Sequence, residues 1–518
     1  MSSDVFYVTT PIYYPNADPH IGSAYTTVAG DFLCRFRRLQ GLSVHYLTGT
    51  DEHGQKILQT AQAAGMEPLE FLDSIIPRYK EAWAHLDIAY DDFIRTTEER
   101  HETSVGRFVQ DLHDRDDVYL GTYEGLYCVG CEAFKQPDEL VDGKCPLHDR
   151  APDVVKEENY FFRLSAYRER LIELYTSQPE RLQPESRRNE ILGKLNVGLD
   201  DLSISRVSFD WGVPIPWDPK HVIYVWIDAL LNYITAVGYG YDDEKFKRIW
   251  PANVHLVGKD ILWFHSVIWP AMLMALDVGL PDTVFAHGFL QVGGEKMSKS
   301  RATAIHPTEL TKVIGVDGYR YHFMREFSFG QDGNFSYEGM VSRYNSDLAN
   351  DLGNLVSRVL SMLGRYLDGV VPEPPRAEEG TDAEDDLVAV HKEAFEGMVR
   401  AMDDIAPHEA LKSCWKFVRK SNAYVEEIAP WALAKDPAQR RRLEVVLYML
   451  ADSLRLLALM TWPIMPRAAQ GLWERLGMDG DVVDRRFDTD NRWLLLPAGN
   501  KVAAGEPLFP RIDDDASG

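Results

Sequence analysis

One pattern within the first 55 residues restricts the fold more than any other. The run VFYVTT is rich in β-branched and aromatic residues and stops at Pro11, which is typical of a buried strand. A turn-rich loop follows, then AYTTVAGDFLCRFRRLQ with helical spacing, then VHYLTGTDEHG, which indicates a second strand and a polar loop. This order predicts an α/β fold with a parallel sheet, whose ligands bind at the carboxyl ends of the strands.

The chain of 518 residues is too long for one hydrophobic core, so we expect several domains. Sheet-like sequence stops near residue 117 and resumes with HVIYVWIDALL, VHLVGKDILWFH and TVFAHGFLQV. We therefore predict a Rossmann-like domain in two halves, split by an insertion. The expected boundaries are 1–117 and 216–295 for the two halves, 118–215 for the insertion, 296–345 for a lysine-bearing loop and its continuation, 346–500 for a helical domain and 501–518 for a tail.

The formal net charge of −25 argues against a protein that holds nucleic acid over a generally basic surface. It does not exclude RNA, because a small basic face on an acidic body is sufficient. No apolar run reaches the roughly 18 residues of a membrane span, and the start MSSDVFYVTT lacks the features of a signal peptide. We expect a cytoplasmic protein without a membrane or DNA partner.

Two short motifs suit the binding of phosphate groups. The first, His20-Ile21-Gly22-Ser23, lies at a predicted helix start, where free N–H groups and the helix dipole favour an anion. The second, Lys296-Met297-Ser298-Lys299-Ser300, follows two glycines and places two ammonium groups on a loop. Taken alone, a histidine before a helix is more often a cap, and a lysine pair on a loop is more often solvated surface.

A cysteine cluster inside the insertion has the spacing of a metal site. Cys128 and Cys131 form one pair, and Cys145 and His148 form a second pair after a gap of thirteen residues. Two such pairs provide the four ligands of a tetrahedral zinc site and leave no open position for catalysis. The alternative is three buried thiols with a chance histidine. We favour a structural Zn²⁺ knuckle.

The order of H-I-G-S and K-M-S-K-S resembles the class I aminoacyl-tRNA synthetases. The resemblance narrows to the methionyl-tRNA synthetases, of the bacterial type with a single zinc knuckle, and it covers nearly the whole chain. It is carried by TTPIYYPNADPHIG, TGTDEHG, YCVGCE, VIYVWIDALLNY, GKDILWFHSVIWPAML, HGFLQVGGEKMSKS, DLGNLVSR and APWALAK. It implies a ligase that uses ATP, with Mg²⁺, to activate L-methionine and transfer it to tRNA(Met), including initiator tRNA.

The resemblance also implies roles for individual residues. Methionine would be bound by Ile12, Tyr14, Asp51, Trp226, Ala229, Leu230, Tyr233, Ile261 and His265, in which Asp51 and the backbone of Ile12 hold the ammonium group. The aromatic members suit a polarizable thioether. ATP would be bound by His20, Gly22, Ser23, Gly258, Asp260, Lys296 and Lys299, with His20, Lys296 and Lys299 as the catalytic residues.

One position departs from the family pattern. The family's first motif commonly ends in a second histidine, and this chain has Ser23. A hydroxyl can donate a hydrogen bond but cannot carry a positive charge, so a role for this position in neutralising phosphate is in doubt.

The region beyond residue 340 reads as helical, with a solvated break at VVPEPPRAEEGTDAEDD. Asn354 and Arg358 are four residues apart and share one helix face, and Trp431 follows Pro430. The resemblance implies that Asn354, Arg358 and Trp431 read the anticodon, since unpaired bases are recognised by edge hydrogen bonds and stacking. It also names 296–345 as the KMSKS loop and stem-contact region and 346–500 as the anticodon-binding domain.

Two alternatives remain open from the sequence. A sister synthetase for Leu, Ile, Val or Cys would share both signature motifs, although the aromatic set and the lack of a large editing insertion favour methionine. A non-catalytic RNA-binding or zinc-scaffold protein is the second, although intact His20, Asp51, Lys296 and Lys299 speak against it. Because the helical region is followed by only a short tail, we expect a monomer.

Overall fold

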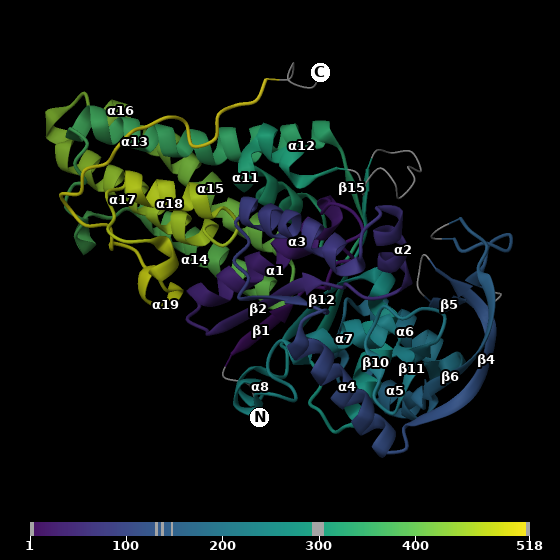
Figure 1. Ribbon diagram of the computed structural model, residues 1–518. Coiled ribbons are helices and arrows are strands. Elements are labelled where there is room, and N and C mark those ends of the chain that lie inside the picture. The colour runs from purple at the N-terminus through teal and green to yellow at the C-terminus, as the bar shows by residue number, and fades with distance from the viewer. Residues whose placement is uncertain (1–4, 130–132, 136–138, 147–148, 293–304, 514–518) are drawn as a thin grey trace. The chain divides into compact units, whose positions relative to one another are not determined.

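The protein is described here from a computed structural model that covers residues 5–129, 133–135, 139–146, 149–292 and 305–513. The chain divides into two compact units (Figure 1). The first unit comprises Met1–Pro19, Val44–Trp83 and Ala89–His287; the second comprises His20–Ser43, Ala84–Ile88 and Gly288–Gly518. None of the helices that the structure describes combines the length and the apolarity needed to cross a membrane.

The first unit is built on a six-stranded sheet in which every pair of neighbours is parallel. In spatial order the strands are β3 (Asp92–Arg95), β2 (Val44–Thr50), β1 (Phe6–Thr9), β12 (Val254–Gly258), β13 (Thr283–His287) and β7 (Leu182–Gln183). The order reverses between β1 and β12, which is the point where such sheets bind ligands. The predicted α/β fold with a parallel sheet is confirmed.

The range 118–215 forms antiparallel sheets and helices of its own. The long strands β4 (Val118–Cys128) and β6 (Asp153–Phe162) pair over ten residues, from Val118 opposite Phe162 to Tyr127 opposite Asp153. These two strands are flanked by β5 (Ala133–Lys135) and β8 (Leu202–Ser203), and a separate sheet consists of β10 (Pro214–Ile215), β11 (Asp218–Ile223) and β9 (Ser205–Arg206). The short strand β7 also comes from this range, and it extends the parallel sheet by pairing with β13.

The remaining parts of the first unit include helices. They are α2 (Gln55–Ala63), α3 (Pro68–His85, which ends in the second unit), α4 (Glu99–Asp114), α5 (Arg168–Ser177), α6 (Glu185–Val197), α7 (Val225–Thr235), α8 (Asp243–Ile249) and α9 (Trp269–Ala275). A π-helical turn, Phe264–Ile268, directly precedes α9. One continuous hydrophobic core joins the inner faces of β1, α4, α7 and α9.

The segment HVIYVWIDALL was predicted to be sheet-like, and this prediction is correct only for its first residues. The strand β11 ends at Ile223, and the rest of the segment forms α7. Every side chain of α7 except Trp226 is buried, so the segment lacks the one-sided apolar periodicity that distinguishes a helix from a strand.

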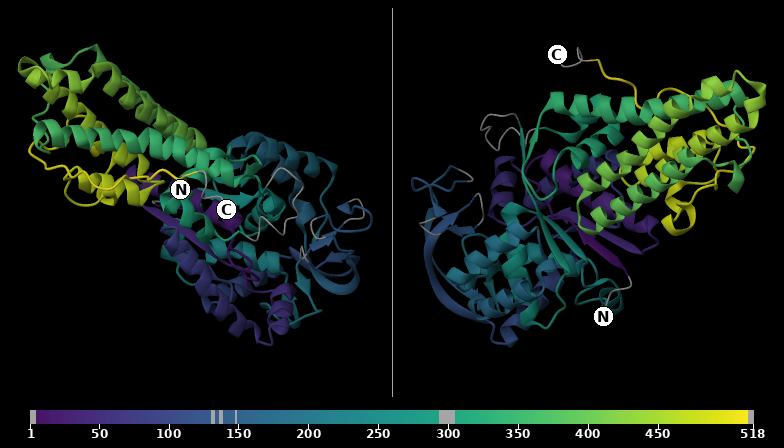
Figure 2. Two further views of the ribbon diagram at one scale, coloured as in Figure 1. Left: turned by 90° about the horizontal axis from the view of Figure 1, so that it is seen from above. Right: turned by 180° about the vertical axis from the view of Figure 1, so that it is seen from behind.

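The second unit is mainly helical, and its long helices run side by side in Figure 2. Its helices are α1 (Ile21–Leu39), α11 (Pro307–Glu326), α12 (Tyr337–Arg343), α13 (Asn354–Leu367), α14 (Asp382–Asp403), α15 (Pro407–Ile428), α16 (Pro430–Leu433), α17 (Arg440–Thr461), α18 (Pro466–Arg475) and α19 (Phe487–Asp490). A π-helix, Tyr344–Gly353, joins α12 to α13, and β14 (Leu290–Val292) pairs in parallel with β15 (Gly333–Phe335).

A buried ion pair ties distant parts of the second unit together. Arg320 on α11 donates to Asp31 on α1 over 2.6 Å, and both side chains are fully buried. The same guanidinium donates to the carbonyls of Leu86, Pro463 and Ile464. Asp31 also pairs with Arg35 over 2.7 Å, so the loss of Asp31 would leave the buried charge of Arg320 uncompensated.

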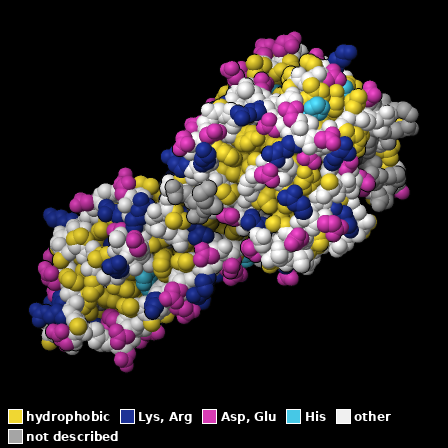
Figure 3. Space-filling model, turned by 90° about the horizontal axis from the view of Figure 1, so that it is seen from below, with side chains coloured by type: hydrophobic (Ala, Val, Ile, Leu, Met, Phe, Trp, Pro, Cys, Tyr) yellow, Lys and Arg dark blue, Asp and Glu magenta, His cyan; other side chains and the backbone are white. Residues whose placement is uncertain are grey.

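On the surface face drawn in Figure 3, acidic and basic side chains alternate over the residues described. This mixture is consistent with an acidic protein that does not bind polyanions over that whole face.

Candidate active site

The residues expected to bind methionine and ATP follow the carboxyl ends of three adjacent strands. Ile12 and Tyr14 come after β1, Asp51 directly follows β2, and Gly258 and Asp260 lie at and just after the end of β12. Since the strand order reverses at β1 and β12, these positions surround the expected ligand crevice of the sheet.

Backbone hydrogen bonds fix the loop that carries Asp51. The Asp51 amide donates to the carbonyl of Tyr13 over 2.9 Å, and the Tyr13 amide donates to the carbonyl of Gly49 over 2.9 Å. Gly49 has to be glycine, because a Cβ there would lie 2.1 Å from the carbonyl oxygen of Ile94. The Tyr14 hydroxyl donates to the carbonyl of His53 over 2.9 Å.

The helix α7 and the π-helical turn supply the remaining methionine candidates. Trp226, Ala229, Leu230 and Tyr233 follow one another at helical spacing on α7, and His265 lies in the π-helical turn. Turns of this kind are rare and often mark functional sites. The Trp226 ring stacks on Phe264, with centroids 3.8 Å apart and planes 10° apart.

A hydrogen-bond chain holds His265 in one tautomer. Its Nδ1 donates to the carbonyl of Ile261 over 2.9 Å, which leaves Nε2 to accept from the Tyr233 hydroxyl over 2.7 Å. Burial lowers the pKa of His265 to about 4, so the imidazole is neutral at physiological pH. Burial raises the pKa of Tyr233, so its hydroxyl keeps its proton.

Two histidines and a carboxylate form a buried network next to these residues. Asp228 of α7 accepts from Nδ1 of His53 over 2.8 Å and from Nε2 of His101 over 2.9 Å. All three side chains are at most 4% exposed. This network was not predicted from the sequence. The available signal was an aspartate inside the otherwise apolar run VIYVWIDALL.

The first signature motif forms the start of α1 in the second unit. His20 is the N-cap, and its Nδ1 accepts from the Gly22 amide over 3.0 Å, while Ser23 completes the capping box. A Cβ on Gly22 would lie 2.9 Å from Cε1 of His20, so the ring requires glycine there. The Ser23 hydroxyl donates to the His20 carbonyl, and burial lowers the His20 pKa. His20 and Ser23 therefore have a capping function in addition to any role in binding ATP.

The second signature motif, with Lys296 and Lys299, lies outside the described residues. The same holds for Cys131 and His148 of the expected zinc knuckle, whereas Cys128 and Cys145 are described and buried. The backbone of Cys145 is fixed by two hydrogen bonds, since its carbonyl accepts from the Asp149 amide over 2.8 Å and its amide donates to the Arg150 carbonyl over 2.9 Å. Within the described ranges, no group of three or more metal-binding side chains occurs.

The three anticodon candidates lie in the second unit. Asn354 and Arg358 occupy successive turns of α13, as predicted, and Trp431 lies in α16. The Arg358 guanidinium lies 5.9 Å from the Trp431 ring centroid and pairs with Glu426 over 2.6 Å. Both Arg358 and Trp431 are about one-third exposed, so their planar groups remain accessible to a base. Glu426 was not predicted.

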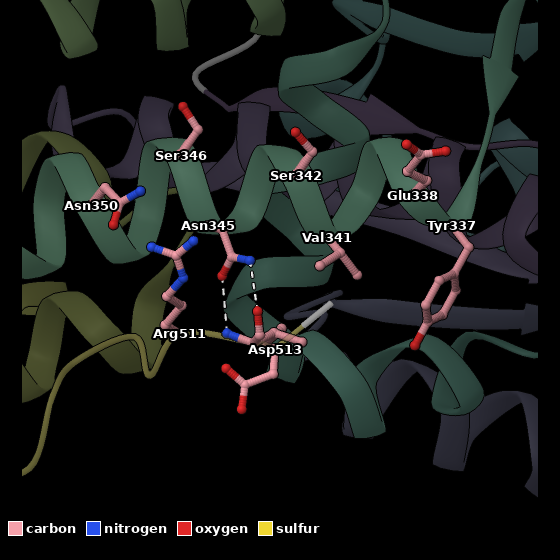
Figure 4. Close-up of a pocket in the computed structure, with 10 residues that line it drawn as sticks. Tyr337, Glu338, Val341, Ser342, Asn345, Ser346, Asn350, Arg511 and Asp513 are labelled. Atoms are coloured by element: carbon pink, nitrogen blue, oxygen red, sulfur yellow. Dashed lines mark hydrogen bonds between the residues drawn. The ribbon is translucent and has the colours of Figure 1, made fainter. Parts of the chain in front are cut away.

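The second unit also contains a hollow of about 880 Å³ beside α12 and the π-helix (Figure 4). Asn345 points into it and exchanges two hydrogen bonds with the backbone of Ile512. The asparagine thus anchors the C-terminal segment.

Comparisons with known families agree with this arrangement. A sequence model described as "tRNA synthetases class I (M)" matches residues 6–151 and 135–360, and a model described as "Anticodon binding domain of methionyl tRNA ligase" matches residues 374–518. With the parallel sheet and the polar residues at its carboxyl ends, these matches define a class I aminoacyl-tRNA synthetase.

Individual relatives narrow the class. A methionine–tRNA ligase of Streptomyces coelicolor is 50% identical over 98% of this chain and 97% of its own, and one of Caldanaerobacter subterraneus is 50% identical over 98% and 79%. The solved structure of Mycobacterium tuberculosis methionyl-tRNA synthetase in complex with methionyl-adenylate is 42% identical, with a TM-score of 0.93 over 98% of this chain and 100% of that one. The chain belongs to the methionyl-tRNA synthetase family.

Proposed function

We propose that this chain activates L-methionine with ATP and transfers it to tRNA(Met), and that the cluster built around Asp51, Tyr233 and His265 is its methionine site. The observation that carries the assignment is the position of Asp51 directly after β2, locked by Tyr13, in a fold that matches a relative bound to methionyl-adenylate. Membership in the family supports methionine against the sister amino acids.

In the first step a methionine carboxylate oxygen attacks the α-phosphate of ATP in line. A new P–O bond forms, the bond to the leaving pyrophosphate breaks, and methionyl-adenylate results. Asp51 would bind the substrate ammonium, together with the Ile12 backbone. In the second step the terminal 2′-hydroxyl of the tRNA attacks the activated carbonyl and releases AMP. Catalysis consists of positioning and charge stabilisation, without a covalent enzyme intermediate.

The thioether pocket would consist of the apolar and aromatic side chains around Tyr233. Tyr14, Trp226, Ala229, Leu230 and Ile261 complete the proposed lining. Thioether sulfur makes favourable contacts with aromatic rings at about 5 Å. A neutral His265 suits this pocket, because a charged imidazolium would oppose burial of an apolar side chain.

The ATP contacts are proposed from the motifs. Gly258 and Asp260 would contact the adenosine ribose, and a Cβ on Gly258 would lie 2.6 Å from Oδ1 of Asp260, so this glycine makes room for the carboxylate. His20 and Gly22, Lys296 and Lys299 would contact the phosphates. Ser23 is a weaker candidate, because its hydroxyl serves the helix cap. Mg²⁺ would accompany the triphosphate and neutralise part of its charge.

We also propose a structural Zn²⁺ on Cys128, Cys131, Cys145 and His148. Burial of both described cysteines and the two backbone hydrogen bonds of Cys145 fit such a knuckle. The remaining proposals are recognition of initiator tRNA as well as other tRNA(Met), action as a monomer, a cytoplasmic location, and the domain boundaries predicted from the sequence.

The methionine site is tested by the variants Asp51→Asn and Asp51→Ala. Both should raise the methionine KM in pyrophosphate exchange by about 100-fold, since each leaves the buried ammonium without its counter-charge. The ATP KM should change little. A control variant is Asp18→Asn, whose carboxylate pairs with Arg78 on an exposed part of the same unit. An unchanged methionine KM in Asp51→Ala would contradict the assignment.

A further inference from the structure

The buried network of His53, Asp228 and His101 joins three elements that the proposed methionine site depends on. His53 lies two residues after Asp51 in the loop that follows β2, Asp228 belongs to α7, and His101 belongs to α4. Asp228 is the hub, because each of its two carboxylate oxygens accepts from one histidine.

The helix α7 carries methionine candidates and the network on different faces. Trp226, Ala229 and Tyr233 are spaced three and four residues apart and therefore share one face of the helix. Asp228 and Thr235 are seven residues apart and share another face. Nδ1 of His101 lies 2.7 Å from the Thr235 hydroxyl. The network therefore fixes the rotation of α7 from the face opposite to the methionine candidates.

The charges of His53 and Asp228 compensate each other. Burial alone would lower the pKa of His53, but the Asp228 carboxylate outweighs it and raises this pKa to about 10. Glu102 faces His53 from α4 at 3.4 Å, and Trp211 covers the ring edge-on at 5.5 Å. The two facing imidazoles hold the pKa of Asp228 below its ordinary value although burial opposes this. Both partners are ionised at neutral pH.

We propose that Asp228 is a positioning residue for methionine binding, which clamps α7 to the loop of Asp51 through His53 and to α4 through His101. The remaining contacts of the loop support this role, because the Gly54 amide donates to the Trp211 carbonyl and the Trp211 indole donates to the Glu52 carbonyl. The inference rests on the proposed role of Asp51.

The direct test is Asp228→Asn, which keeps the shape of the side chain and removes its charge. A displacement of about 1 Å in a binding group can lower activity by about 100-fold. We expect the methionine KM in pyrophosphate exchange to rise at least about tenfold, with an ATP KM within about twofold of the unmodified enzyme. The matched control is Asp201→Asn, whose carboxylate accepts from the Tyr119 and Ser165 hydroxyls in the range 118–215. It should lower the Tm and leave the methionine KM unchanged.

A second pair of variants applies if Asp228→Asn does not fold. His53→Asn keeps an N–H donor near the position of Nδ1, whereas His53→Ala removes it. We expect the methionine KM of His53→Asn to lie several-fold closer to that of the unmodified enzyme. Equal methionine KM values in folded Asp228→Asn and the unmodified enzyme, or in both His53 variants, would overturn the proposal. Asp51→Ala distinguishes a failure of this proposal from a failure of the proposed function, because it tests the ammonium site without altering the network.

Discussion

The hydroxyl of Tyr233 donates to Nε2 of His265 over 2.7 Å, and this bond fixes the orientation of the imidazole in the proposed pocket. The other ring nitrogen donates to the Ile261 carbonyl, so neither nitrogen is left to bind a polar substrate group. A pocket closed in this way favours an apolar side chain with a polarizable atom over one that needs a hydrogen bond.

Tyr233→Phe tests this bond. The variant leaves Nε2 of His265 buried without its donor, which lowers stability by about 1–3 kcal/mol. We expect a methionine KM raised by about tenfold and an ATP KM that is unchanged. Thermal unfolding and pyrophosphate exchange measure the two effects. A variant with ordinary stability and ordinary methionine KM would show that the bond is dispensable.

His322 of α11 is a buried histidine with no role in the proposed chemistry. Neither ring nitrogen has a hydrogen-bond partner among the described residues, and Phe323, Phe327 and Phe335 surround the ring. Burial lowers its pKa to about 3, so protonation favours the unfolded chain as the pH falls below about 6.5.

His322→Phe should therefore stabilise the protein, and more in acid than at neutral pH. The increase in the free energy of unfolding should be about 2 kcal/mol larger at pH 5 than at pH 7, because the histidine is protonated at pH 5 in the unfolded chain and not in the folded one. Denaturant unfolding at both pH values measures it. An equal increase in the free energy of unfolding at both pH values would show that His322 is already charged in the folded state at pH 5.

Trp431→Ala tests the anticodon assignment. Loss of one stacked base lowers affinity by about 1–3 kcal/mol, so the tRNA KM in aminoacylation should rise about 5- to 150-fold. Methionine-dependent pyrophosphate exchange should not change, because it needs no tRNA. Arg358→Gln should behave similarly, and Arg365→Gln, two turns further along α13, serves as its control. A loss of pyrophosphate exchange in Trp431→Ala would place its effect outside anticodon reading.

Cys145→Ser tests the zinc knuckle. Loss of one thiolate ligand should abolish stoichiometric zinc in the purified protein, measured by elemental analysis, and should increase hydrogen exchange around residues 141–150. Cys414→Ser is the matched control, because this cysteine is buried in α15 of the other unit. A Cys145→Ser protein that retains one zinc per chain would contradict the ligand set.

Lys299→Ala tests the second signature motif, which the described residues do not include. We expect an activation rate lower by about 100-fold, as for the loss of one group that stabilises charge in the transition state. Lys312→Ala on α11 is a control for removal of a lysine. An unchanged rate of pyrophosphate exchange would remove Lys299 from the chemistry.

The sequence predicted those features that depend on local pattern. The β1–α1–β2 order, the placement of Asp51 at the end of a strand, and the shared helix face of Asn354 and Arg358 all follow from hydrophobic periodicity and spacing. It missed relationships between distant segments. The edge strand β7 is only two residues long, and it joins the sheet because of tertiary packing.

The buried network illustrates the same limit. His53, His101 and Asp228 are 127 to 175 residues apart in their hydrogen-bonded pairs, so no local pattern could assign them to one another. Glu426 beside Arg358 was missed for the same reason. An isolated carboxylate in an apolar helix nevertheless requires a buried partner, which is a signal that the sequence does contain.

The most direct test of the central claim is amino-acid-dependent pyrophosphate exchange on the purified chain, with methionine, leucine, isoleucine, valine and cysteine measured in parallel. We predict exchange with methionine and, at comparable concentrations, negligible exchange with the other four. Faster exchange with any of those four, or no exchange by the folded protein, would contradict the proposed methionine site and the function built on it.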